Sequence, residues 1–202
     1  MERLFSTVVG DAKLKGLLFD KEAFLMYYID MEPLPIVKLG LTYINNPSNA
    51  KALDYGAGAG RNAVYLARQG LQVLAVDKNQ NILETIPTND HLQIKCADIT
   101  KWQIPGTFDY VIATNILHFF NPEIASDCIK KIATATSENG ILALTYIIDK
   151  KESVPQSVLE AINSYYQTIV SETKTVKDSG HPGMPEPHKH TIFYYLGRKI
   201  SQ

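Results

Sequence analysis

A glycine-rich stretch at residues 54–62, with the sequence DYGAGAGRN, constrains the fold of this chain more than any other feature. It follows an apolar run from Ala50 to Leu53, which is typical of a buried strand, and it precedes residues 63–68, which have the composition of a helix. At a glycine-rich turn from strand to helix, the backbone can approach a ligand very closely because no side chain intervenes. The sequence therefore predicts a ligand site at the end of the first strand.

The spacing of the glycines distinguishes between two kinds of ligand. A dinucleotide fingerprint has the form G-x-G-x-x-G, but here Arg61 stands at the third glycine position, and the glycines are residues 56, 58 and 60. This argues against a nicotinamide-dependent oxidoreductase, which remains the alternative enzyme class. The G-x-G-x-G form, preceded by the acidic Asp54, resembles motif I of the class I S-adenosylmethionine methyltransferases. A glycine-rich turn without a ligand is the structural alternative.

Acidic residues follow the next two predicted strands. Asp77 ends the apolar run 71–76 and lies roughly 20 residues past the glycine turn, where a doubly wound fold places a carboxylate on ribose hydroxyls. Asp98 follows a short strand at 92–95 and resembles the family residue that faces the adenine amino group. Asp98 can also be a helix cap or a turn residue, since aspartate is favoured at both.

Strands and helices alternate along the rest of the chain. We expect strands at 108–115 and 141–148, helices at 122–137 and 154–166, and an antiparallel pair at 168–176 and 191–200. The helix that begins at Pro122 should end at Asn139-Gly140 in a left-handed cap. The pattern predicts an α/β, doubly wound, mostly parallel seven-stranded sheet with an antiparallel last strand, which is the Rossmann-like methyltransferase fold.

The N-terminal quarter has a different pattern. Residues 1–48 are predicted to form a helical extension or lid, and residues 49–202 the cofactor-binding methyltransferase domain. The candidate helical segments of the extension are 13–19, 23–29 and 36–44. Tyr27 and Tyr28 in this extension either cover the cofactor or pack the helix onto the body.

Within the class I enzymes, the chain resembles the tellurite-resistance (TehB-like) methyltransferases. The resemblance rests on Gly60-Arg61-Asn62, on Val76-Asp77-Lys78-Asn79 and on the closing 196–199, and it extends over residues 33–199. The chain departs from the family at Ala57-Gly58, where a Cys-Gly pair is common, and in the loop before the last strand, which is compressed and carries three histidines.

The resemblance implies that S-adenosyl-L-methionine is the cofactor. The ammonium group of the cofactor would be bound by Asp54, the ribose hydroxyls by Asp77, and the adenine by the region of Asp98. The cofactor-binding residues that it implies are Asp54, Gly56, Ala57, Gly58, Gly60, Asn62, Asp77, Lys78, Asp98, Ile99 and Asn115.

The methyl acceptor is expected to be a small-molecule nucleophile, such as a chalcogen oxyanion, a thiol or another small metabolite. Methyl transfer is an in-line displacement with a good leaving group, so the enzyme mainly has to position the nucleophile. His118, after the fourth strand, is a candidate base or cation, and packing at the edge of the core is the alternative for it. His188, in the loop before the last strand, is the second candidate catalytic residue. A protein that binds the cofactor without catalysis is the non-enzymatic alternative.

The loop histidines also allow a metal site to be considered. His188 and His190 would share one face of a strand, and Glu186 lies nearby in sequence. Because exposed loop histidines without a metal are commoner, we expect no metal site.

The composition of the chain indicates which classes of partner and which cellular compartment to expect. The 202 residues carry a formal net charge of −1, and no basic face or acidic tail indicates a nucleic-acid partner. The chain has no apolar run of roughly 20 residues that would span a membrane, and its N-terminus lacks the apolar segment of a signal peptide. The two cysteines, Cys96 and Cys128, are expected to be buried thiols. We therefore expect a cytoplasmic protein.

Overall fold

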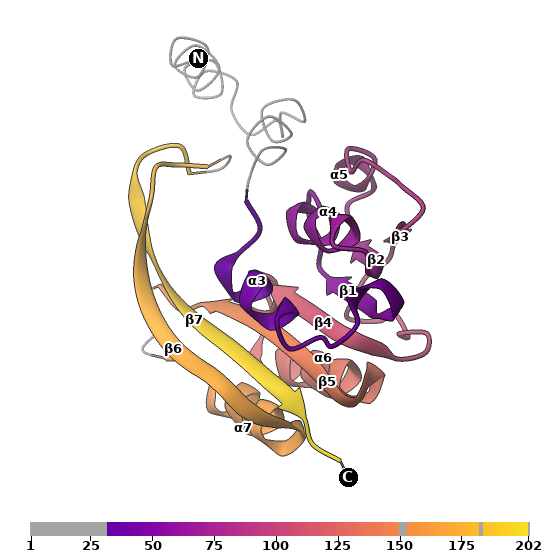
Figure 1. Ribbon diagram of the computed structural model, residues 1–202. Coiled ribbons are helices and arrows are strands. Elements are labelled where there is room, and N and C mark those ends of the chain that lie inside the picture. Colours follow the sequence, from indigo (N-terminus) through magenta and orange to yellow (C-terminus); the bar gives the residue numbers. More distant parts are fainter. Residues whose placement is uncertain (1–31, 150–152, 182–183, 202) are drawn as a thin grey trace.

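A seven-stranded sheet forms the centre of the molecule, with the strand order β3-β2-β1-β4-β5-β7-β6. The computed structural model describes residues 32–149, 153–181 and 184–201. Strands β1 to β5 are parallel to one another, whereas β7 lies antiparallel between β5 and β6 (Figure 1). The strands are β1 (Lys51–Tyr55), β2 (Gln72–Asp77), β3 (Leu92–Cys96), β4 (Phe108–Thr114), β5 (Thr136–Ile147), β6 (Tyr166–Asp178) and β7 (His188–Lys199). The predicted fold class is confirmed, including the antiparallel last strand.

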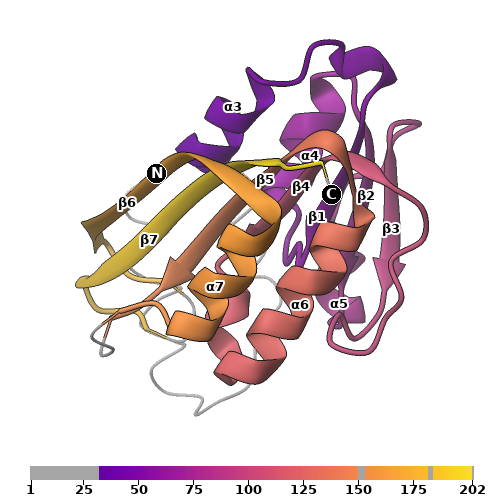
Figure 2. The ribbon, with the colours of Figure 1, turned by 90° about the horizontal axis from the view of Figure 1, so that it is seen from below.

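Helices cover both faces of the sheet (Figure 2). One face packs against α3 (Pro35–Leu41), α4 (Arg61–Arg68) and α5 (Gln80–Leu83). The other face packs against α6 (Pro122–Ala135) and α7 (Gln156–Tyr165). Two short 3-10 helices, η1 (Pro47–Asn49) and η2 (Leu117–Phe119), lie in the connections. No helix in the described part of the chain is long and apolar enough to cross a membrane.

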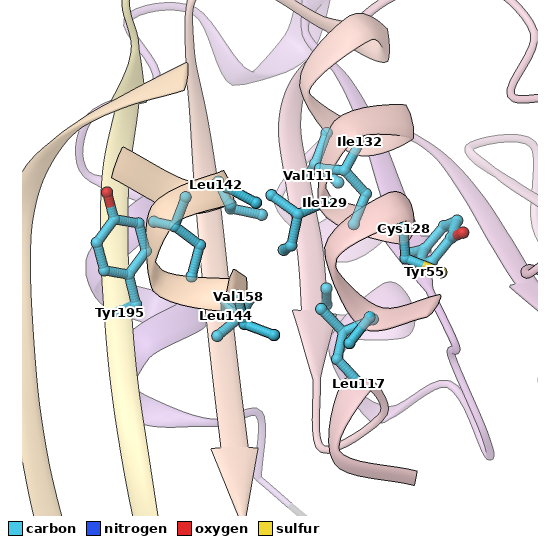
Figure 3. Close-up of a cluster of buried hydrophobic side chains, with 14 of the residues drawn as sticks. Tyr55, Val111, Leu117, Cys128, Ile129, Ile132, Leu142, Leu144, Val158 and Tyr195 are labelled. Carbon is cyan, nitrogen blue, oxygen red and sulfur yellow. The ribbon is translucent and has the colours of Figure 1, made fainter. Parts of the chain in front are cut away.

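The alternation of side chains along each strand explains the apolar composition of the central strands. On β4, Val111 belongs to the core cluster under α6 and α7, while its neighbour Tyr110 belongs to the cluster under α3 and α4. Figure 3 shows Leu142 and Leu144 of β5 beside Ile129 of α6. Because helices bury both faces, both sets of alternating residues must be apolar.

One helix of the N-terminal extension lies within the described residues. α3 is anchored to the sheet by the Tyr110 hydroxyl, which donates to the carbonyl of Val37 at 2.8 Å, and both groups are buried. The predicted segments 13–19 and 23–29, with Tyr27 and Tyr28, lie outside the described residues. A cover over the cofactor by the extension stays a prediction.

Two predictions about local structure are wrong. The helix from Pro122 ends at Ala135, not at Asn139-Gly140, because Thr136 already pairs with Phe108 as the first residue of β5. Asn139 does have a left-handed φ of 61°, but it lies within the irregular start of that strand. Cys96 is exposed rather than buried, since β3 is an edge strand, whereas Cys128 is buried as expected, and both thiols are free.

Candidate functional site

The glycine turn lies between β1 and α4, at the carboxyl edge of the parallel strands. Its three glycines have φ values of 84°, 54° and 76°, in the left-handed region that favours glycine. A Cβ atom at Gly56 would overlap Ile116, and one at Gly60 would overlap Ile86. At Gly58, in contrast, a Cβ atom would meet nothing within 4 Å. The first and last glycines are therefore needed for packing, and Gly58 is the one whose bare backbone faces open space.

Asp54, at the end of β1, is a buried carboxylate that the protein leaves partly unsatisfied. The residue is only 1% exposed, and its Oδ2 atom has no hydrogen-bond partner in the described part of the chain. Burial raises the pKa of Asp54 to about 7, although the Ala63 N–H and the charge of Arg61 both favour ionisation. A cationic group placed at Oδ2 would remove this cost, so the residue suits an ammonium ligand.

Asp77, at the end of β2, joins the glycine turn to the neighbouring strand. Its Oδ2 atom accepts a hydrogen bond from the Gly58 N–H at 3.0 Å, and its Oδ1 atom accepts one from the Asn79 N–H at 2.9 Å. The side chain also lines the cavity described next. Asp77 can thus hold the turn in place and offer its remaining lone pairs to ligand hydroxyls.

A cavity of about 550 Å³ opens between the ends of β1 and β2 and the segments after β3 and β4. This volume lies in the range of small-molecule and cofactor sites. Acidic groups and apolar side chains share its wall, which is a lining suited to a nucleoside. The lining residues are Gly56, Asp77, Lys78, Asp98, Ile99, Thr100, Ile116, Phe119, Phe120 and Ile124.

Five of the predicted cofactor residues, at positions 56, 77, 78, 98 and 99, line this cavity. Asp98 also acts as a turn residue, because its Oδ1 atom accepts hydrogen bonds from the N–H and the hydroxyl of Thr100 at 3.0 and 2.7 Å. These bonds hold the pKa of Asp98 below its usual range, so the carboxylate is ionised where it faces the cavity.

The amides of Asn62 and Asn115 are engaged by the protein itself. Asn62 accepts from the Leu34 N–H at 3.1 Å and donates to the Thr114 hydroxyl at 3.0 Å, so it links the start of α3 to the end of β4. Asn115 has a left-handed φ of 53°, and its Oδ1 atom accepts from the Thr145 hydroxyl at 2.7 Å. Both residues shape the backbone around the site.

Ala57, the remaining predicted cofactor residue, anchors the turn through its backbone. Its N–H and that of Gly56 both donate to the carbonyl of Val76 at 2.9 Å. This shared acceptor fixes the start of the turn on β2.

The two histidines predicted as catalytic lie on different elements. His118 is a half-buried residue of η2, and its ring lies 4.0 Å from the ring of Phe119, which lines the cavity. His188 begins β7 and contacts His181 and His190. The described contacts thus place His118 beside the cavity wall and His188 in a separate group of histidines.

The aromatic part of the cavity wall was not predicted. Phe119 is 73% exposed, and with Phe120 and Ile124 it closes the cavity on the side of β4. The signal available in the sequence was the pair of adjacent phenylalanines in the connection between the strand predicted at 108–115 and the helix predicted from Pro122.

A smaller cavity of about 310 Å³ lies at the opposite edge of the sheet. Its wall includes Tyr43, Asn139 and Arg198, near the start of β5 and the end of β7. None of the predicted site residues lines it, so the larger cavity is the candidate site.

A family model matches residues 39–168, well over half of the chain, and its description is tellurite resistance protein TehB. The chain belongs to the TehB family. The resemblance inferred from the glycine turn and from residues 76–79 is therefore confirmed.

Proteins with similar sequences have names that refer to S-adenosyl-L-methionine. A protein of Haemophilus influenzae (strain 10810), named probable S-adenosyl-L-methionine-dependent methyltransferase TehB, is 29% identical over 141 residues, which are 63% of this chain and 49% of that protein. A carboxy-S-adenosyl-L-methionine synthase of Campylobacter concisus (strain 13826) is 28% identical over 129 residues, 60% of this chain and 55% of the other. The chain thus spans about half the length of these curated relatives.

Solved structures establish the fold. The crystal structure of TehB from Haemophilus influenzae has a TM-score of 0.69 at 19% identity, over 89% of this chain and 66% of that chain. The N-methyltransferase NodS from Bradyrhizobium japonicum WM9, in complex with S-adenosyl-L-homocysteine, has a TM-score of 0.62 at 14% identity, over 90% and 97% of the two chains. The [4+2]-cyclase SpnF also has a TM-score of 0.62 at 14% identity, over 83% and 81%. The fold therefore does not by itself fix the reaction.

The buried carboxyl group of Asp54 predicts a pH dependence of stability. Its folded-state pKa of about 7 lies above the ordinary aspartate value of 3.8, so the folded protein binds the proton more tightly than the unfolded chain does. This contribution to stability is complete below pH 4 and is lost as the pH rises toward 7. Between pH 5 and pH 7.5 we expect a loss of about 2 kcal/mol in the free energy of unfolding.

Urea denaturation of the ligand-free protein and of Asp54→Asn at the two pH values measures this loss. The variant should lack about 2 kcal/mol of the pH-dependent change, since its side chain does not titrate. An identical pH dependence in both proteins would show that Asp54 ionises normally in the folded state.

Proposed function

We propose that this chain binds S-adenosyl-L-methionine at the carboxyl ends of β1, β2 and β4 and transfers its methyl group to a small-molecule nucleophile. The observation that carries the proposal is the open backbone at Gly58, whose N–H donates to the cavity-lining Asp77. The buried Oδ2 atom of Asp54, which has no partner among the described residues, adds to it. The names of the TehB relatives support it.

The residues present fit this cofactor part by part. The Oδ2 atom of Asp54 would pair with the ammonium group, which is the strongest match because it satisfies a buried charge. Asp77 would accept hydrogen bonds from the ribose hydroxyls while it keeps the bond from Gly58. The adenine ring would lie in the apolar part of the cavity beside Ile99, with Asp98 near its amino group.

The protein's part in the reaction is mainly positioning. The bound cofactor supplies an electrophilic methyl group on a sulfonium, and the leaving group is neutral. The walls around Ile116, Phe119 and Phe120 would limit the directions from which an acceptor can approach. An acceptor that is already anionic or soft needs no strong base, whereas a protonated one would need a group such as His118.

The size of the cavity and the net charge of the chain support a small-molecule acceptor. A cavity of about 550 Å³ has room for the cofactor and a small molecule only. A net charge of −1 gives no attraction for nucleic acid. We propose a thiol, a chalcogen oxyanion or a similar small nucleophile, with His118 and the loop around His188 on the acceptor side.

Calorimetric titration with S-adenosylhomocysteine tests the cofactor proposal, with Gly58→Ala as the informative variant. Both Gly58 and Gly106 have a left-handed φ and open space around the missing Cβ, but Gly106 lies in the loop before β4, away from the cavity. Both alanine variants should lose similar stability, because both strain the backbone. Only Gly58→Ala should weaken binding, by tenfold or more, which is about 1.4 kcal/mol.

Three results would contradict the proposal. Equal binding by Gly58→Ala and Gly106→Ala would show that the ligand does not approach the backbone at Gly58. Tighter binding of NADH than of S-adenosylhomocysteine would favour the oxidoreductase alternative. Binding without any methyl transfer to acceptors would favour a non-catalytic role.

Kinetic measurements distinguish two possible roles of His118, a base in methyl transfer and a packing residue. Methyl transfer would be followed as S-adenosylhomocysteine formation, with 2-mercaptoethanol and with sodium tellurite as acceptors in separate reactions. If His118 acts as a base, His118→Ala should lower turnover by about 10²–10⁴-fold for the protonated thiol and leave cofactor affinity nearly unchanged. The exposed His91, whose ring bonds to the Gln72 side chain, provides the control His91→Ala. Unchanged turnover with a lowered melting temperature would assign His118 to packing.

A further inference from the structure

Three histidines and an aspartate meet at the tip of the β6–β7 hairpin. Asp178 ends β6, His181 lies in the connection, and His188 and His190 lie at the start of β7. One ligand atom from each of these side chains lies within 4.8 Å of the others. All four residues are half-buried. The group is distinct from the cavity-lining residues of the proposed cofactor site.

Hydrogen bonds fix the orientation of two of the rings. The Nδ1 atom of His188 lies 2.8 Å from the backbone carbonyl of Glu186, and a carbonyl only accepts, so this nitrogen carries the proton. The Nδ1 atom of His190 lies 2.7 Å from the Oδ2 atom of Asp149. The Oδ1 atom of Asp149 also accepts a hydrogen bond from the Thr191 N–H at 2.7 Å, which fixes this carboxylate beside the His190 ring. Both rings therefore direct Nε2 toward the centre of the group.

The two Nε2 atoms lie only 2.7 Å apart. With a proton on each Nδ1, both Nε2 atoms present lone pairs, and two lone pairs at this distance repel. The arrangement needs a positive centre between them, which is either a shared proton or a metal cation. Around a zinc ion with tetrahedral bonds of about 2.0–2.1 Å, two nitrogens lie roughly 3.4 Å apart, so a small opening of the rings would admit the ion.

The residues around the two Nε2 atoms favour a metal cation over a shared proton. Three imidazole nitrogens and one carboxylate oxygen form a donor set that zinc and related divalent transition metals accept. Metal-binding histidines characteristically donate their second N–H to a carboxylate or a backbone carbonyl, as His190 and His188 do here. A shared proton would need only two rings, and it would not explain the convergence of His181 and Asp178 on the same point.

We propose that Asp178, His181, His188 and His190 bind one divalent transition-metal ion, with zinc as the first candidate. The ion would fix the hairpin tip to the end of β5, because Asp149 follows β5 and holds both His190 and the Thr191 N–H. The Ile148 N–H pairs with the Thr191 carbonyl, so the site lies beyond the carboxyl end of β5, at the same edge of the sheet as the cofactor cavity. Metal binding would occupy His188 Nε2 and leave His118 to act on the acceptor. This proposal does not depend on the proposed methyl transfer.

Calorimetric titration of the full chain with zinc chloride, after removal of bound metal by a chelator, tests the site. The parent protein should bind one zinc ion per chain. His188→Ala and His190→Ala should each weaken binding by more than tenfold, and Asp149→Asn by about 10–100-fold through loss of its support for His190. His91→Ala should bind zinc like the parent. Binding of cobalt(II) should give the intense visible absorption of a four-coordinate ion.

Zinc affinity that is equal in His188→Ala, His190→Ala and His91→Ala would overturn the proposal, as would the absence of one-to-one binding by the parent. In the second case the two nitrogens share a proton. The affinity of the same variants for S-adenosylhomocysteine serves as the control for folding. We expect it to equal that of the parent protein. If His190→Ala does not fold, Asp178→Asn replaces it, because that change removes a ligand and keeps the shape of the side chain. A failure of zinc binding with intact S-adenosylhomocysteine binding would refute the metal site alone.

Discussion

The hydrogen bond from the Gly58 N–H to the carboxylate of Asp77 joins the ends of β1 and β2, and the geometry of the candidate site depends on it. It holds a backbone segment with a left-handed φ in one position relative to the acid that would bind the ribose. The packing of Ile116 and Ile86 against the two neighbouring glycines fixes the same segment from the other side. The turn is thus rigid where it packs and bare only at Gly58, which is the condition for close contact with a ligand.

Much of this arrangement is predictable from the sequence, because it depends on local signals. The alternation of strands and helices, the glycine spacing and the acids after β1 and β2 all lie close together in the chain, and the sheet places their ends at one edge. The family resemblance was recognised from the same residues and was confirmed over 39–168.

The errors and omissions arise where distant residues decide the structure. Asn62 forms hydrogen bonds with Leu34 and Thr114, which are 28 and 52 positions away in the sequence. The residues next to Asn62 therefore do not indicate that it joins α3 to β4. The helix from Pro122 ends early because sheet pairing with Phe108 determines its last residue. Two aspartates complete the histidine group: Asp149 bonds to His190 from 41 positions away in the sequence, and Asp178 lies on the other strand of the hairpin. The expectation of no metal site considers His188, His190 and Glu186 only, and it stays a prediction. The site proposed above also uses Asp178 and Asp149, which the sequence alone does not place near these histidines.

In the proposed cofactor site, Asp54 is a preformed partner for the ammonium group. The most direct test of this role compares the parent protein with Asp54→Asn. Their affinities are measured for S-adenosylhomocysteine and for 5′-methylthioadenosine, which lacks the amino-acid group. We predict that Asp54→Asn weakens S-adenosylhomocysteine binding by about 1.5–3 kcal/mol, the range for a hydrogen bond to a charged group, and leaves methylthioadenosine binding unchanged. An equal effect on both ligands, or no effect on either, would contradict it.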